Sequence, residues 1–177
     1  MNTFEFEKKM QALADTFYRQ RGLQVDRSGA CKKFDCVISR ADMPGVTQKI
    51  EEKFNRVEYP YKNGLIEIVQ DMESADLGWY LETGCEFLHW FECTEVDGEY
   101  RLSVLYRLKW DDFKKWFNTN LLITRPKVVK QHYGLTFNLT FPWDKCIKEV
   151  ETCKKYMVPQ FAPLTPPFTP QRKKDAA

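Results

Sequence analysis

Residues 49–54, KIEEKF, have the pattern of a buried β-strand but carry three consecutive charged side chains in the middle. The apolar residues of this segment are typical of a strand that packs against a core. Burying an unpaired charge is costly, so such a strand tolerates Glu51, Glu52 and Lys53 only where they find partners or bind a metal ion. The fold must therefore supply a reason for each of these charges.

Strand geometry divides the three charges between two faces. Because side chains alternate across a strand, Glu51 and Lys53 share one face and Glu52 lies on the other. The segment 34–38, FDCVI, predicts the preceding strand. If the two strands are hairpin neighbours, Asp35 converges with Glu51 and Lys53. Two close carboxylates repel each other unless a cation lies between them, and Mg²⁺ or Mn²⁺ beside a lysine suits phosphodiester hydrolysis. Glu52 has no explanation in this pattern.

Asp35, followed after fifteen intervening residues by Glu51-Glu52-Lys53, resembles the PD-(D/E)xK nuclease superfamily, the restriction-endonuclease-like fold. The resemblance covers roughly residues 4–70, and Phe34 replaces the proline of the motif's name. It implies a mixed α/β sheet with flanking helices, in which an N-terminal helix precedes a strand meander. It also implies an Mg²⁺- or Mn²⁺-dependent endonuclease that acts on DNA in preference to RNA, and it is compatible with a homodimer, because members of this superfamily commonly dimerise to cut two strands. Asp35 and Glu51 would bind metal, and Lys53 would serve the attacking water.

Two other interpretations of the same residues stay open. One is a non-catalytic module that keeps the nuclease-like fold and binds nucleic acid or protein. The other is a structural domain without a site, in which residues 49–54 form an exposed edge strand with an ordinary Glu-Lys alternation. Two further [DE]-x-K matches, starting at Glu7 and Asp112, lie in helical patterns, so strand context is what distinguishes Glu51.

Three more residues are candidates for the same site. Many members of the superfamily carry an acidic residue on the N-terminal helix. Glu7 borders the apolar face of the helix predicted over 4–21, whereas Glu5 points away from it, although the helix dipole also favours an acid in the first turn. Glu67 and Gln70, in the strand predicted over 65–70, are supporting candidates on opposite faces.

Aromatic and basic residues suggest contacts with nucleic acid. Trp79 and Tyr80 follow a glycine in a predicted loop, where aromatic rings could stack on bases. Arg27, Lys32 and Lys33 belong to a basic stretch that could contact phosphates, although a solvated surface is the more frequent explanation of such clusters. A second basic stretch contains Arg125, Lys127 and Lys130.

Periodicity and turn signals predict the other elements. A hairpin with strands over 87–94 and 99–108 surrounds a V-D-G turn, and residues 75–86 fit a loop, a short helix or a strand. Helices are predicted over 109–120 and 143–157, and a late strand over 134–143. We expect a single nuclease-like domain over residues 1–158 and an extended or disordered, Pro-rich basic tail over 159–177.

Composition excludes several classes of protein. A chain of 177 residues, 43% hydrophobic and 29% charged, is typical of one globular domain with a core. It has no apolar run long enough for a membrane helix and no signal-peptide pattern, so we expect a cytoplasmic protein. Six scattered cysteines predict reduced thiols in the core, and two histidines, His89 and His132, exclude a histidine-rich metal site.

Overall fold

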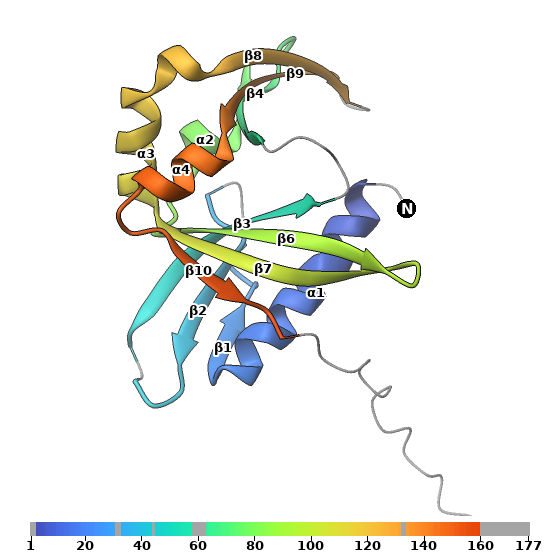
Figure 1. The fold of residues 1–177 in the computed structure, drawn as a ribbon, viewed down its shortest axis with the longest axis vertical. Helices are drawn as coiled ribbons and strands as arrows, with labels where there is room; N and C mark the ends of the chain where they lie inside the picture. The colour runs from blue at the N-terminus through green and yellow to red at the C-terminus, as the bar shows by residue number, and fades with distance from the viewer. Residues whose placement is uncertain (1–2, 31–32, 44, 58–62, 132–133, 160–177) are drawn as a thin grey trace, which may run out of the picture.

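The strands of the protein form two sheets (Figure 1). The computed structural model describes residues 3–30, 33–43, 45–57, 63–131 and 134–159. The larger sheet has six strands in the order β1-β2-β3-β6-β7-β10, and the smaller has four in the order β5-β4-β9-β8. All neighbours are antiparallel except β3 and β6, which are parallel. The predicted mixed α/β fold is confirmed, but the sequence pattern did not predict the second sheet.

The first half of the larger sheet follows the N-terminal helix directly. α1 (Thr3–Gln20) leads into a meander of β1 (Leu23–Asp26), β2 (Cys36–Arg40) and β3 (Thr47–Arg56). Gly22, with φ of 74°, makes the left-handed turn between the helix and β1. The sequence pattern missed β1, because a four-residue edge strand with alternate positions exposed gives little hydrophobic signal.

β4 (Asn63–Asp71) confirms the strand predicted over 65–70, but it does not continue the meander. It pairs with β9 in the smaller sheet, beside the two-residue β5 (Asp76–Leu77). The short α2 (Trp79–Glu82) then leads the chain back to the larger sheet. A strand pattern gives no information about the pairing partner, and β9 lies far away in the sequence.

The predicted hairpin is confirmed as β6 (Phe87–Val96) and β7 (Glu99–Lys109). Asp97 and Gly98 connect the two strands with φ angles of 54° and 77°. Two consecutive positive φ angles are typical of a tight turn whose twist matches that of the strands. β6 also lies beside β3, so the hairpin joins the meander to the rest of the larger sheet.

The predicted helix over 109–120 is confirmed as α3 (Trp110–Thr119). After η1 (Leu121–Ile123), the chain forms a second hairpin, β8 (Arg125–Gln131) and β9 (Gly134–Pro142). β9 confirms the predicted late strand. β8 was not predicted, because it is an edge strand whose side chains are nearly all exposed and show no apolar alternation.

The helix predicted over 143–157 is wrong in its second half. α4 (Trp143–Glu149) ends where the Val150 N–H donates a hydrogen bond to the Cys146 carbonyl, and β10 (Lys154–Met157) follows. β10 pairs antiparallel with β7 and completes the edge of the larger sheet. Helical spacing could not show that β7 offers unpaired backbone groups to this segment.

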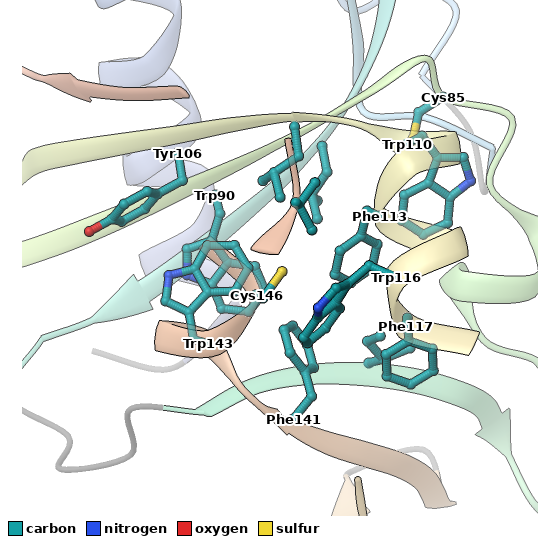
Figure 2. Close-up of a cluster of buried hydrophobic side chains, with 14 of the residues drawn as sticks. Cys85, Trp90, Tyr106, Trp110, Phe113, Trp116, Phe117, Phe141, Trp143 and Cys146 are labelled. Atoms are coloured by element: carbon teal, nitrogen blue, oxygen red, sulfur yellow. The ribbon is translucent and has the colours of Figure 1, made fainter. Parts of the chain in front are cut away.

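Two cores lie on opposite faces of the larger sheet. On one face, the buried side of α1 packs through Phe6, Met10, Ala14, Phe17 and Tyr18. On the other face, an aromatic core joins the larger sheet to α3, α4 and the smaller sheet (Figure 2). Its largest members are Trp90, Tyr106, Trp110, Phe113, Trp116, Phe117, Phe141 and Trp143. Most of the aromatic residues of the chain thus serve packing.

The five cysteines in the described part of the chain are free thiols, and four of them are buried, as predicted. Among the described residues, no helix is long and apolar enough to cross a membrane. Lys32, Cys31 and residues 160–177, which form nearly all of the predicted tail, lie outside the described residues.

Candidate functional site

The register of β2 and β3 brings Asp35 next to Glu51. Cys36 lies opposite Ile50, and the Asp35 N–H donates a hydrogen bond to the Ile50 carbonyl at 2.8 Å. The Asp35 carboxylate accepts a hydrogen bond from the Glu52 N–H at 2.7 Å. The predicted pairing of these two strands is therefore confirmed, and Asp35 is fixed at the end of β2, against the backbone of β3.

Lys53 is held between a carboxylate and an indole ring. Its Nζ donates a hydrogen bond to Glu51 Oε1 at 2.5 Å, and Glu51 is only 4% exposed. The same Nζ lies 4.4 Å from the centroid of the Trp79 ring, within the range of a cation–π interaction. Glu51 and Lys53 thus share one face of β3, as strand alternation predicted.

The charges of this pair depend on each other. Burial raises the pKa of Glu51 to about 7; Lys53 lowers this pKa, and Asp35 raises it. Burial alone would lower the pKa of Lys53. The nearby carboxylates, of which Glu51 has the largest effect, raise this pKa by more than burial lowers it, so the net shift is upward. Lys53 is therefore an ammonium at neutral pH, whereas Glu51 changes its protonation state close to neutrality.

Two further carboxylates approach this ion pair from other elements. Burial raises the pKa of Glu7, although the residue as a whole is exposed; Lys53 lowers this pKa and Asp35 raises it. Burial also raises the pKa of Glu67, which Lys53 and a hydrogen bond from the Trp79 N–H lower. Glu7 on α1 and Glu67 on β4 therefore contribute to the electrostatics of the same site. Four carboxylates act on one ammonium, which leaves an excess of negative charge.

Gly78 allows α2 to approach β4 closely enough to form one wall of the site. Its N–H donates a hydrogen bond to the Ile68 carbonyl at 2.8 Å. A Cβ atom at this position would lie 2.3 Å from the carbonyl oxygen of Glu67, far inside van der Waals contact. The absence of a side chain at Gly78 therefore brings the Trp79 N–H to Glu67, and the Trp79 ring to Lys53.

The structure does not bring Gln70 into this group. Gln70 is half-buried on β4, and none of the described contacts links it to the four carboxylates. Within the described ranges, no three His, Cys, Asp or Glu side chains form a group that could hold a metal ion. An ion at Asp35 and Glu51 would therefore take its other ligands from water or phosphate oxygens, which is common for Mg²⁺.

Glu52 has a different role on the opposite face of β3. It is 4% exposed and accepts a hydrogen bond from Arg27 Nη1 at 2.9 Å and another from the Tyr18 hydroxyl at 3.0 Å. Arg27 also forms an ion pair with Asp15 at 2.6 Å. The sequence pattern missed this network because the partners of Glu52 lie 25 and 34 residues away.

The residues predicted to contact nucleic acid are used in different ways. Trp79 and Tyr80 are half-buried; the first ring covers Lys53, and the Tyr80 hydroxyl donates a hydrogen bond to Asn118 Oδ1 at 3.1 Å. Arg27, predicted to contact phosphates, forms internal ion pairs with Asp15 and Glu52. Lys33 is exposed. The second basic stretch lies on the edge strand β8, where Arg125, Lys127 and Lys130 are exposed.

Comparison with known proteins adds no relative to these observations: no protein-family model matches the chain, and a search of curated proteins gives no significant match.

Proposed function

We propose that the chain is a metal-dependent nuclease of the PD-(D/E)xK type. The observation that carries the proposal is the placement of Asp35 beside the hydrogen-bonded pair of Glu51 and Lys53, with Glu7 and Glu67 adding negative charge around them. The order of elements adds support. α1 followed by the β1-β2-β3 meander matches the order that the resemblance implies.

The donor atoms at this site fit a hard divalent cation. Asp35 and Glu51 offer carboxylate oxygens, the ligands that Mg²⁺ and Mn²⁺ prefer, and the surrounding carboxylates exceed the single ammonium. Bound there, the ion would lower the pKa of a water molecule and neutralise charge on the scissile phosphate. Asp35 is already oriented for this role by its hydrogen bond from the Glu52 N–H.

Lys53 would position the attacking water and stabilise negative charge that develops on the phosphate. The Lys53 ammonium is paired with a Glu51 oxygen. A cation that binds this oxygen would compete with the ammonium, which would then be able to contact the substrate. The Trp79 ring, which contacts the ammonium, would keep the Lys53 side chain within the site. Glu7 and Glu67 would keep Lys53 protonated, because negative charge nearby favours the ammonium.

A second candidate function is a non-catalytic binding module with the same fold. The internal hydrogen bond between Glu51 and Lys53 favours it, because each group already satisfies the other. In that case the exposed basic side chains of β8 would provide the contacts with phosphate.

The decisive experiment tests cleavage and binding in parallel. Purified protein is incubated with plasmid, linear duplex, single-stranded and branched DNA, and with RNA, each in Mg²⁺, Mn²⁺ or EDTA. Asp35→Asn and Lys53→Met keep the size of the side chain while they remove its charge. Asp111→Asn and Lys115→Met, two exposed positions on α3, are the matched controls. Circular dichroism confirms that each variant is folded.

The proposal predicts metal-dependent cleavage of DNA in preference to RNA that both site variants abolish and both controls retain. Cleavage that persists in EDTA or in Asp35→Asn would rule out this site. Binding of nucleic acid without any cleavage would support the binding module instead. Sedimentation of the active protein with duplex DNA would determine whether it acts as a homodimer, which the resemblance implies.

A further inference from the structure

A cavity of about 230 Å³ lies on the face of the larger sheet opposite the carboxylate site. The C-terminal part of α1 covers it, and β1, β2, β3, β6, β7 and β10 contribute the other walls. Phe17, Leu23, Ile38, Leu105 and Tyr156 make most of its surface apolar. Its volume is several times the ~30 Å³ that one water molecule occupies, so a small organic molecule would fit.

Arg107 brings an uncompensated positive charge into this cavity. Its guanidinium lies 3.6 Å from the centroid of the Phe87 ring, and Nη2 donates a hydrogen bond to Gln48 Oε1 at 3.2 Å. Within the described part of the chain it forms no ion pair, and its burial lowers its pKa. The other two guanidiniums of the cavity differ: Arg40 is paired with Asp42, and Arg21 is exposed, so water solvates its charge. Arg107 is therefore the half-buried cation that lacks a counter-ion.

His89 adds an unused hydrogen-bond acceptor to the same wall. The imidazole is 2% exposed, and its Nδ1 lies 2.8 Å from the Tyr18 hydroxyl. That hydroxyl donates its single proton to the Glu52 carboxylate, which forms an ion pair with Arg27. Nδ1 must therefore carry the proton of a neutral imidazole, which leaves Nε2 as an acceptor. Nε2 is buried and has no hydrogen-bond partner among the described residues.

We propose that this cavity binds a small carboxylate with an apolar body and a hydroxyl or N–H donor. The carboxylate would pair with Arg107 and replace its hydrogen bond with Gln48, and the donor would satisfy His89 Nε2. Phe17 and Leu105 would cover the apolar body. A half-buried cation without a counter-ion and a buried acceptor without a donor are both unfavourable, and one such ligand would compensate both. The site is separate from the carboxylates of the proposed nuclease and does not depend on that function.

Isothermal titration calorimetry of the full chain tests this proposal with 4-hydroxybenzoate as the probe. 4-Hydroxybenzamide has the same shape without the charge, and benzoate lacks the donor. Arg107→Met removes the cation, and Val46→Trp fills the mouth of the cavity from a position that is 54% exposed. Arg125→Met, on the exposed edge strand β8, is the matched control. Thermal unfolding checks that each variant is folded.

We expect saturable binding of 4-hydroxybenzoate at one site per chain, and binding about tenfold weaker or more for either comparison compound. Arg107→Met and Val46→Trp should each weaken binding by a similar factor, whereas Arg125→Met should leave it unchanged. Absence of 4-hydroxybenzoate binding to the unaltered chain would overturn the proposal. Equal binding of the benzamide, or unchanged binding by folded Arg107→Met, would do the same. Cleavage assays do not enter this test, so failure of the proposed nuclease function would leave its result unaffected.

Discussion

Removing Arg27 should destabilise the protein, and the loss should grow with pH. The Arg27→Met variant keeps the length of the side chain but leaves Glu52 buried without its cation. The Tyr18 hydroxyl still donates to Glu52, but one neutral hydrogen bond does not compensate a buried carboxylate. Breaking a buried ion pair from one side costs about 3–5 kcal/mol.

Protonation of Glu52 sets an upper limit to this loss. In the unaltered protein, burial is the largest influence on the pKa of Glu52 and raises it, and Arg27 opposes this shift. Removing Arg27 should therefore raise the pKa of Glu52 further. An unfolded glutamate has a pKa of about 4.3, and keeping the carboxyl protonated costs about 1.4 kcal/mol for each pH unit above that value. The limit is therefore about 4 kcal/mol at pH 7 and about 1 kcal/mol at pH 5.

The sign of the pH dependence follows from the direction of this shift. The folded state holds the Glu52 proton more tightly than the unfolded state, so the free energy of unfolding falls as pH rises above the unfolded pKa. We expect Arg27→Met to lose about 3–4 kcal/mol at pH 7, which corresponds to a fall in Tm of roughly 6–16 °C for a chain of this size. At pH 5 the loss should be about 1 kcal/mol.

Urea unfolding followed by tryptophan fluorescence at pH 5, 6 and 7 measures this effect, because the larger core contains several buried tryptophans. Arg40→Met is the control, since Arg40 and Asp42 form an exposed pair whose removal should leave the stability nearly unchanged. The double variant Arg27→Met, Glu52→Gln should recover much of the loss and its pH dependence. A loss below about 1 kcal/mol at pH 7, or a double variant no more stable than the single one, would refute the reasoning.

Three other predictions concern the proposed site and the core. Cleavage should rise with pH through about 7, because Glu51 must be ionised to hold the metal ion; a profile that is flat from pH 6 to 8 would contradict this role. Lys53→Met should lose cleavage yet bind Mn²⁺ at least as tightly as the unaltered chain in electron paramagnetic resonance titrations, because no ammonium then competes for Glu51. Weaker binding would mean that Lys53 does not compete with the ion. Phe141→Ala should cost about 3–5 kcal/mol in urea unfolding, because this ring is 1% exposed and touches five aromatic neighbours, whereas Leu122→Ala, at a fully exposed position, should cost less than about 0.5 kcal/mol. Similar costs for the two variants would show that the aromatic core is not where stability resides.

The local features of β3 could be predicted from the sequence, and its long-range partners could not. Alternation alone assigns Glu51 and Lys53 to one face, and the turn-rich segment before β3 favours pairing with β2. Glu52 looked anomalous because its partner, Arg27, comes from the segment after β1, a strand too short to give a hydrophobic signal. An ion pair between distant segments leaves no local pattern.

The assignment of strands to sheets was limited in the same way. β4 has the composition of a strand, but whether it extends the meander or pairs with β9 depends on tertiary contacts. Glu67 was therefore a candidate without a defined face, and only the crossing of α2 over β4 shows that it acts on Lys53. The segment of β10 has a helical pattern, yet the open edge of β7 determines its conformation.

The pairing of β4 with β9 has a consequence for the order in which the chain folds. Asn63 pairs with Pro142, so the smaller sheet cannot form until nearly all of the domain has been synthesised. The α1–β3 meander and the β6–β7 hairpin close short loops and should form early. β4 cannot pair with β9, and its core residue Ile66 cannot be fully buried, until β9 has been synthesised. On the ribosome this strand would lack its β9 partner during that time, and we expect it to be the point at which the nascent chain most needs protection from aggregation.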